Sequence, residues 1–348
     1  MDKSFLDQTR LAEFLQTLRL FGELHGPTVS EEGVASFAPL NRDSLLRLDY
    51  RRTQIPPKKY LIPFREEILA YREGSYRESS QQAPEIVLFG LHPCDLAGIA
   101  YLDRVFLGDR PDPSYASRRA KLTLVGVSCE PDDFCFCNES LGSTACDLFL
   151  SAVPEGFEIT AWSAKGEEIA QAAQEFLVKA SFGTGNRSAP SPLSSRPGTG
   201  SDSSDSSDSS GATPTCRGVR PQDPQLRFSE HPLWQIFAER CVSCGACSVC
   251  CPTCYCFDVR EYPGLSGGAT RIREWDNCLF LSHGEVAGAN FRAIRLERLR
   301  YRFLHKYCGF TPLQGMTSCV GCGRCRKVCP VDIDLRELFT EPAAPDTP

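Results

Sequence analysis

Two cysteine runs in the last third of this 348-residue chain constrain its fold and chemistry more than any other feature. The first run extends from Cys241 to Cys251 and the second from Cys319 to Cys329, and each is followed by a proline. Both match the pattern C-x2-C-x2-C-x3-C-P. In proteins with two [4Fe–4S] clusters, three thiolates at this spacing bind one cluster, and the cysteine before the proline binds the other. The runs therefore predict one interlocked unit that holds two [4Fe–4S] clusters.

The spacing assigns four cysteine ligands to each cluster. Cluster 1 takes Cys241, Cys244, Cys247 and Cys329, and cluster 2 takes Cys319, Cys322, Cys325 and Cys251. Gly245 and Gly323 leave room for backbone N–H groups to approach the sulfurs, and such hydrogen bonds tune the reduction potential. The alternative is structural zinc, which binds two C-x2-C pairs but requires neither the third cysteine nor the fourth one before proline. Zinc would make the protein a zinc-stabilised interaction module instead.

Whether the 19 cysteines form disulfides or stay reduced depends on the compartment in which the protein works. No long apolar stretch follows the first residues, and no part of the chain is apolar enough to cross a bilayer. We therefore expect a cytoplasmic protein without a membrane span, in which clustered thiols stay reduced and serve metal or redox chemistry. The net charge of −6 disfavours nucleic acid as a partner. We interpret the basic stretch from Arg292 to Lys306 as a solvated helix face.

Composition divides the chain into three parts. Residues 1–182 are predicted to form an α/β domain, residues 183–225 a disordered linker rich in Ser, Asp, Gly and Pro, and residues 226–348 a mainly helical, ferredoxin-like two-cluster domain. In the first part, apolar periodicity predicts helices over 5–24, 96–106 and 169–177, and strands over 85–89, 122–127, 148–153 and 157–162.

Four further cysteines follow two of these predicted strands. Cys94 follows the strand at 85–89, while Cys129, Cys135 and Cys137 follow the strand at 122–127. Because ligands bind at the carboxyl ends of strands in an open α/β sheet, the four thiols meet if the two strands are neighbours. The N-terminus of the helix after Cys94 would also stabilise a thiolate or an anionic cluster. These residues define a candidate third [4Fe–4S] site, with a zinc site or packed thiols as alternatives.

No other cofactor motif is present. The sequence has no phosphate-binding loop or dinucleotide-binding glycine pattern, and its five histidines do not show zinc-enzyme spacing. A self-contained reductase would need a cluster with an open iron site, but the two runs supply all eight thiolates, which leaves only the N-terminal site for that hypothesis. We interpret Cys254, Cys256 and Cys278 as packing residues, with an approach to the clusters or a further site as alternatives. Four other cysteines are interpreted as structural: Cys146, Cys216, Cys250 and Cys308.

The segments around the two runs form a wider pattern. They are His231-Pro-Leu-Trp234, Cys251-Pro-Thr-Cys254-Tyr-Cys256-Phe257, Arg273-Glu-Trp275-Asp-Asn-Cys278 and Glu297-Arg298-Leu-Arg300-Tyr301-Arg302. The pattern resembles the beta subunit of cytoplasmic sulfhydrogenases ([NiFe] hydrogenase/sulfur reductase) and the related A subunit of anaerobic sulfite reductase. A looser likeness continues upstream through Pro93-Cys94-Asp95-Leu96 and Cys135-Phe136-Cys137. The Ser/Asp-rich stretch departs from the pattern.

The resemblance implies an iron–sulfur electron-transfer subunit that is not itself catalytic. Such a subunit passes electrons between a flavin subunit that handles NAD(P)H and a metal-containing catalytic subunit. On this resemblance, the expected terminal partner is a hydrogenase or sulfur reductase, and an anaerobic sulfite reductase is the alternative.

Overall fold

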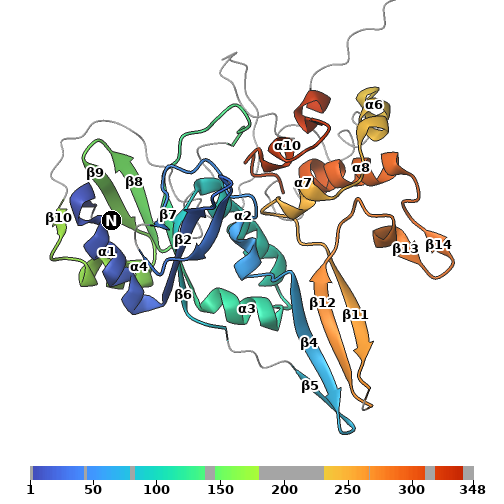
Figure 1. Cartoon of the computed structure of the whole chain (residues 1–348), viewed down its shortest axis with the longest axis horizontal. Helices are drawn as coiled ribbons and strands as arrows, with labels where there is room; N and C mark the ends of the chain where they lie inside the picture. Colours follow the sequence, from blue (N-terminus) through green and yellow to red (C-terminus); the bar gives the residue numbers. More distant parts are fainter. Residues whose placement is uncertain are drawn as a thin grey trace, which may run out of the picture.

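The computed structural model describes residues 3–42, 45–78, 83–137, 146–179, 231–265, 267–309 and 318–339. The predicted linker at 183–225 lies outside these residues. Two sheets organise the described part of the chain, an eight-stranded sheet in the N-terminal region and a four-stranded sheet beside it (Figure 1).

The eight-stranded sheet has the strand order β10-β1-β9-β8-β7-β6-β2-β3. Four neighbouring strands in its middle, β2, β6, β7 and β8, run parallel, and the outer pairings are antiparallel. The strands are β1 (Ser4–Asp7), β2 (Glu23–Val29), β3 (Ala35–Pro39), β6 (Ile86–Leu91), β7 (Leu122–Val127), β8 (Leu148–Val153), β9 (Gly156–Ala161) and β10 (Leu177–Lys179). The predicted α/β character of this region is thereby confirmed.

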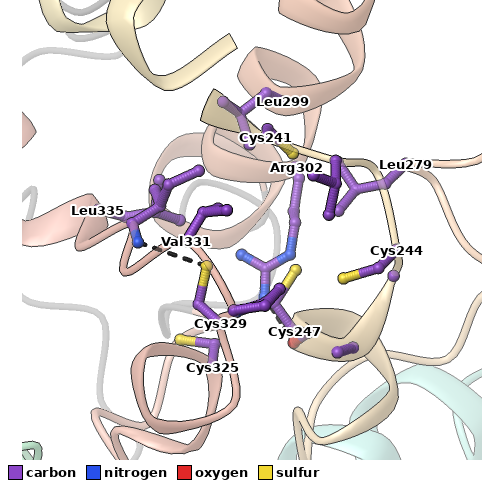
Figure 2. Close-up of a pocket in the computed structure, with 15 residues that line it drawn as sticks. Cys241, Cys244, Cys247, Leu279, Leu299, Arg302, Cys325, Cys329, Val331 and Leu335 are labelled. Atoms are coloured by element: carbon purple, nitrogen blue, oxygen red, sulfur yellow. Dashed lines mark hydrogen bonds between the residues drawn. The ribbon is translucent and has the colours of Figure 1, made fainter. Parts of the chain in front are cut away.

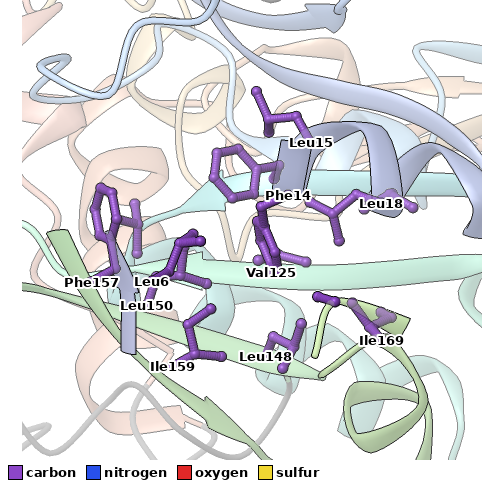
Figure 3. Packing of buried hydrophobic residues seen from close by; sticks show 14 of the residues in the cluster. Leu6, Phe14, Leu15, Leu18, Val125, Leu148, Leu150, Phe157, Ile159 and Ile169 are labelled. Atoms are coloured by element: carbon purple, nitrogen blue, oxygen red, sulfur yellow. The ribbon is translucent and has the colours of Figure 1, made fainter. Parts of the chain in front are cut away.

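Side-chain alternation along the strands builds a core on each face of this sheet. On β6, Val87 and Phe89 join one buried cluster, and Leu88 joins the other. The first cluster packs against α1 (Leu11–Leu18) and α4 (Ala164–Ala172), as Figure 3 shows for Phe14, Leu18 and Ile169. The second packs against α2 (Pro93–Phe106) and α3 (Pro113–Ala120). Because successive side chains of a strand point to opposite faces of the sheet, helices pack on both faces.

All three predicted helices have different bounds in the structure, and the one predicted over 96–106 is α2, which begins three residues earlier. The segment predicted as one helix over 5–24 instead contains β1, a 3₁₀ turn at Gln8–Arg10, α1, and a second 3₁₀ turn at Arg19–Phe21. The Asp7 carboxylate accepts a hydrogen bond from the Thr9 N–H and so starts a turn where a continuous helix was expected. The helix predicted over 169–177 is α4, which ends at Ala172 and is followed by β10.

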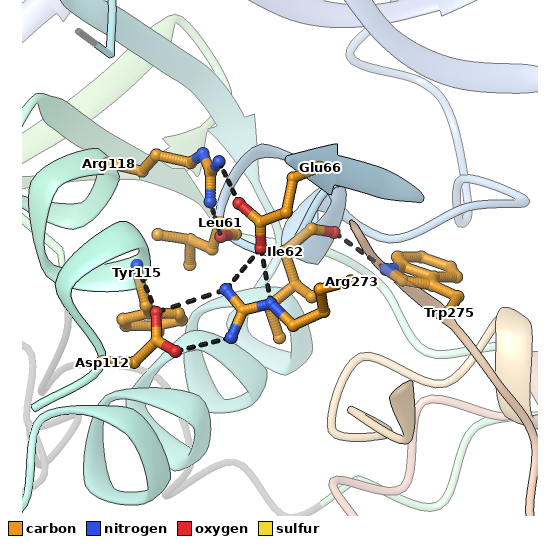
Figure 4. Close-up of polar contacts among 8 residues, drawn as sticks. All are labelled: Leu61, Ile62, Glu66, Asp112, Tyr115, Arg118, Arg273 and Trp275. Carbon is orange, nitrogen blue, oxygen red and sulfur yellow. Dashed lines mark hydrogen bonds and ion pairs between the residues drawn. The ribbon is translucent and has the colours of Figure 1, made fainter. Parts of the chain in front are cut away.

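The four-stranded sheet combines strands from both sides of the predicted linker. Its order is β11-β12-β4-β5, formed by β4 (Arg65–Arg72), β5 (Ser75–Glu78), β11 (Phe257–Pro263) and β12 (Ala269–Trp275). A buried polar network fastens the central pair, because Glu66 on β4 lies between Arg118 of α3 and Arg273 of β12 (Figure 4). The other side of the Arg273 guanidinium contacts Asp112, at a distance of 3.2 Å from Nη2.

The C-terminal region contains both helices and strands. Its helices are α6 (Leu233–Arg240), α7 (Ala246–Val249), α8 (Arg295–Leu304) and α10 (Arg324–Lys327), with short 3₁₀ or π turns at Ser282–Gly284, His305–Gly309 and Leu335–Phe339. A small hairpin, β13 (Glu285–Val286) with β14 (Ala289–Asn290), accompanies the long hairpin β11–β12. The prediction of a mainly helical domain is therefore not confirmed, because the insertion between the cysteine runs forms these hairpins.

Candidate iron–sulfur centres

One cavity lies between the first cysteine run and the end of the second. Its lining includes the four thiols assigned to cluster 1: Cys241, Cys244, Cys247 and Cys329. The other lining side chains are mainly apolar, such as Leu279 and Leu299, and Figure 2 shows Arg302 reaching from α8 toward the cysteines. Thiols from two distant stretches of sequence therefore surround one apolar space, as an interlocked pair of clusters requires.

A second cavity lies between the end of the first run and the start of the second. Its lining includes the four thiols assigned to cluster 2: Cys251, Cys319, Cys322 and Cys325. Cys325 and Arg302 line both cavities, so the two spaces share a wall. The remaining lining includes Pro252, Val320 and Tyr307.

Backbone geometry around both cavities suits anionic sulfur. Gly245 and Gly323 precede α7 and α10 with φ values of +76° and +69°, a left-handed conformation that glycine adopts without strain. Backbone N–H groups point at two of the sulfurs, from Ser243 to Cys241 at 3.4 Å and from Ile333 to Cys329 at 3.3 Å. Apolar walls, converging thiols and N–H donors fit an iron–sulfur cluster, whose potential such donors tune.

Two buried cations from α8 and the turn after it accompany the thiols, and the sequence interpretation missed them. Arg302 is 4% exposed and donates to the Cys247 carbonyl at 2.8 Å, while Lys306 is also 4% exposed and donates to the Thr253 hydroxyl at 2.8 Å. Burial alone would lower the pKa of each cation, but neighbouring thiols, led by Cys247 for Arg302 and Cys251 for Lys306, raise both values.

The interpretation of this basic stretch as a solvated face is therefore wrong for Arg298, Arg302 and Lys306, all of which are buried. Their spacing of four residues was the available signal, because residues four apart share one helix face. Positive charge on a face that packs toward cysteine-lined cavities stabilises the negative charge that cluster thiolates carry.

The four N-terminal cysteines meet at one edge of the large sheet. Strands β6 and β7 are parallel neighbours, so Cys94, which opens α2, and Cys129, just after β7, lie at the same edge. Cys137 contacts Cys135 by a hydrogen bond, and the charges of Cys94 and Cys129 also act on its pKa, which is raised. Burial raises the pKa of Cys129 to about 11. The strand pairing on which the third site depended is present.

This N-terminal thiol group packs directly against the second cysteine run. The Phe136 N–H donates to the Gly321 carbonyl at 2.8 Å. Both Gly321 and Gly323 have left-handed φ values, and a Cβ on either would lie within 2.6 Å of backbone atoms of residues 134–137. The two loops therefore touch backbone to backbone.

Arg324 of the second run also connects this run to the start of α2 by electrostatic contacts. Its guanidinium is 1% exposed, lies 2.8 Å from Asp95 and 3.8 Å from the Cys94 sulfur, and donates to the Thr53 carbonyl at 2.9 Å. Burial raises the pKa of Asp95, although the ion pair with Arg324 opposes that shift. A second arginine, Arg52, donates to the Cys135 sulfur at 3.3 Å. Cations thus flank the N-terminal thiols as well.

The other cysteines fall into two groups. Cys146 and Cys250 are buried, and Cys216 and the side chain of Cys308 lie outside what the structure describes. Cys254 hydrogen-bonds Cys251, and Cys256 hydrogen-bonds both Cys278 and His283. Within the described ranges, no three His, Cys, Asp or Glu side chains are grouped to hold a single metal ion. No helix in the described part of the chain is long and apolar enough to cross a membrane.

Comparison with known proteins places the site in a defined class. Residues 240–333 match the family described as 4Fe-4S dicluster domain, which defines the C-terminal region as an iron–sulfur domain. The chain is 34% identical over 345 residues to "Sulfhydrogenase 2 subunit beta" of Pyrococcus furiosus, covering 94% of this chain and 95% of that protein. No solved structure matches. The chain belongs to the sulfhydrogenase beta-subunit family, and this membership supports an iron–sulfur electron-transfer subunit.

Proposed function

We propose that this chain relays electrons between a flavin subunit that handles NAD(P)H and a metal-containing catalytic subunit of the hydrogenase or sulfur reductase type. The family supports a role as a subunit. The observation that carries the proposal is the contiguous series of three thiol groups: two cavities that share Cys325, and a third group whose loop contacts Gly321 and Gly323.

In this proposal, eight cysteines of the C-terminal runs hold two [4Fe–4S] clusters, with the ligand sets given by the spacing. Cys94, Cys129, Cys135 and Cys137 hold a third. When bound, the clusters supply one-electron redox chemistry at potentials that hydrogen bonds and solvent exposure set. The chain's own residues position the thiolates, donate N–H groups to sulfur, and exclude water through apolar walls.

The buried arginines have a role of their own. Arg302 lies between the two C-terminal cavities, and Arg324 lies between the second cavity and the N-terminal thiols. A fixed positive charge favours the more negative, reduced state of any group beside it. These two side chains therefore raise the reduction potential at the two junctions of the series.

The number of clusters is tested by metal analysis of the full chain purified without oxygen. We expect about twelve iron and twelve acid-labile sulfide per chain, with brown colour that bleaches on reduction. Cys129→Ser should lower the iron content by about four, because one ligand of the third site is lost. Cys146→Ala, which changes a buried cysteine outside the three groups, should leave it unchanged. A colourless protein with bound zinc would refute the proposal.

The partners are tested by purifying the native complex under mild conditions. The expected complex contains a flavoprotein that oxidises or reduces NAD(P)H and a subunit with a separate metal centre. A chain that purifies alone from its native source, with its clusters intact, would contradict the relay role but not the cluster assignment.

A further inference from the structure

A pair of cysteines outside the three thiol groups lies at the base of the long hairpin. Cys256 directly precedes β11 and Cys278 follows β12, and the Asp276 N–H donates to the Cys256 carbonyl at 3.0 Å, which extends the hairpin ladder to this point. Both thiols are free, and a side-chain hydrogen bond joins them. The hairpin thus brings together two sulfurs that are 22 positions apart (278 minus 256) in the sequence.

Three donors converge on the Cys256 sulfur. They are the Cys278 thiol, the Cys278 backbone N–H and the His283 side chain. His283 in turn contacts the Asp276 carboxylate through Nδ1. This is the arrangement of a thiol with a histidine partner that a carboxylate orients, which activates cysteine as a nucleophile.

Electrostatics in the site agree with this geometry. The hydrogen bond from Cys278 is the main effect that lowers the pKa of Cys256, to about 4. Burial acts in the opposite direction, and the hydrogen bond from His283 lowers the pKa further. The hydrogen bond with Cys256 and the Asp276 carboxylate raise the pKa of His283 to about 9, although burial opposes the shift. Asp258 faces His283, and the other titratable or charged groups that face the two cysteines are Tyr255, Tyr301, His305, Arg302 and Cys254.

The two thiols differ in access. Cys278 is 2% exposed, whereas Cys256 is half-buried and lines a small cavity with Cys254, Trp275 and Asp276. The Lys58 ammonium also lines this cavity and lies 4.2 Å from the centre of the Trp275 ring. An accessible thiolate beside a buried thiol is the arrangement of an attacking and a resolving cysteine.

We propose that Cys256 and Cys278 form a thiol–disulfide exchange site for small-molecule disulfides, in which Cys256 attacks, Cys278 resolves and His283 carries the proton. The Cys256 thiolate forms a bond with one sulfur of the small disulfide and breaks its S–S bond. The departing thiolate takes the proton of the His283 imidazolium. Neutral His283 then takes the Cys278 proton, and the Cys278 thiolate attacks the Cys256 sulfur, which expels the second small thiolate.

The exchange balances without another reactant. The two protein sulfurs lose two electrons to the small disulfide, which leaves as one thiol and one thiolate, and His283 ends protonated as it began. Small thiols in excess drive the reverse reaction and regenerate the dithiol. The proposal is independent of the proposed electron relay, although Cys254 connects the pair to Cys251 of the second cavity.

The test uses the full chain, purified without oxygen and treated with 2-hydroxyethyl disulfide before alkylation and peptide mass mapping. The wild-type protein should yield a Cys256–Cys278 cross-link. Cys278→Ser should instead retain a stable hydroxyethyl adduct on Cys256, because no resolving thiol remains. Cys146→Ala should behave as the wild type. Absence of both the cross-link and the adduct overturns the proposal.

The role of His283 is tested by the rate of Cys256 alkylation with iodoacetamide between pH 5 and pH 8. The wild-type rate should be nearly independent of pH, whereas in His283→Gln it should rise with pH, because the Cys256 sulfur keeps the Cys278 donors but loses the imidazolium. A flat profile in the variant removes His283 from the proposal.

Metal analysis of the same samples separates this proposal from a metal site and from the relay. The exchange site is overturned if the wild type binds zinc and both Cys256→Ser and Cys278→Ser lose it while their cluster absorbance stays unchanged. A wild-type protein that shows no cluster absorbance before the disulfide treatment refutes the relay. The Cys256–Cys278 cross-link can still be measured in that protein by mass, so the two proposals fail separately.

Discussion

At the scale of single residues, the placement of charge is the feature that most affects function. Arg302 is the clearest case, because its side chain lines both C-terminal cavities and hydrogen-bonds the Cys247 carbonyl. Lys306 and Arg324 continue the same arrangement toward the N-terminal thiols. In a water-poor interior such charges act strongly on any nearby group that gains an electron.

Replacing Arg302 should therefore shift the reduction potentials of both C-terminal clusters. Arg302→Met removes a positive charge that favours the reduced state, so we expect both potentials to fall by on the order of 100 mV. Arg302→Lys keeps the charge and should shift them much less. Redox titration monitored by electron paramagnetic resonance measures the change. Equal potentials in wild type and Arg302→Met would contradict this role.

The close approach of two loops makes a second prediction at this scale. Gly321 has a φ of +67°, and a Cβ there would lie 2.5 Å from the Phe136 carbonyl oxygen. Gly321→Ala should destabilise the protein by about 3 kcal/mol, from left-handed strain and overpacking together. Gly288→Ala is the matched control, because Gly288 has a φ of +84° with open space around it, and should cost only about 1 kcal/mol. Urea unfolding compares the two, and equal losses would argue against a tight loop contact.

At the scale of elements, the sequence predicted most of the strands and helices whose positions depend on local residue patterns. Strand β7 has the predicted bounds, and β6 begins within one residue of its prediction, because apolar runs are local signals. Helix α2 begins three residues before the predicted start at 96, and Pro93 at its first position was the signal for this earlier start. The pairing of β12 with β4 could not be predicted, since it depends on contacts between segments far apart in sequence. The spacing of Arg298, Arg302 and Lys306 indicates one shared helix face, but which face is buried depends on the same kind of distant contact. The cysteine spacing predicted which thiols line each cavity, but that assignment of ligands stays a prediction until metal is measured.

The shared four-stranded sheet supports a prediction about its buried ion network. Glu66 is 4% exposed at its side chain and contacts both Arg118 and Arg273 (Figure 4). Glu66→Gln leaves the buried Arg273 and the half-buried Arg118 without their shared carboxylate and should reduce the free energy of unfolding by about 3 kcal/mol. On the same sheet, Glu261→Gln breaks a pair whose glutamate side chain is 57% exposed and should cost less than about 1 kcal/mol. Chemical denaturation measures both, and similar losses would contradict a special role for the buried network.

At the scale of the whole molecule, the N-terminal and C-terminal regions share too many contacts to behave as separate units. The β4–β12 pairing joins residues more than 190 positions apart in the sequence. The contact between Glu66 and Arg273, which are 207 positions apart, stabilises this pairing. The Arg324–Asp95 ion pair and the contact of Gly98 with Pro252 join the regions again beside the second cavity. Breaking the fold at one end therefore exposes buried polar groups at the other.

We accordingly predict one cooperative unfolding transition for the cluster-loaded protein. Denaturation without oxygen, followed by visible absorbance for the clusters and by circular dichroism for the sheets, should give coincident curves, because the loops that hold the thiols also hold the two regions together. Gly321→Ala should lower both midpoints equally. The opposite result is equally clear: if the cluster absorbance disappears while the circular dichroism of the large sheet persists, the C-terminal domain unfolds independently and the contacts across the two regions contribute little.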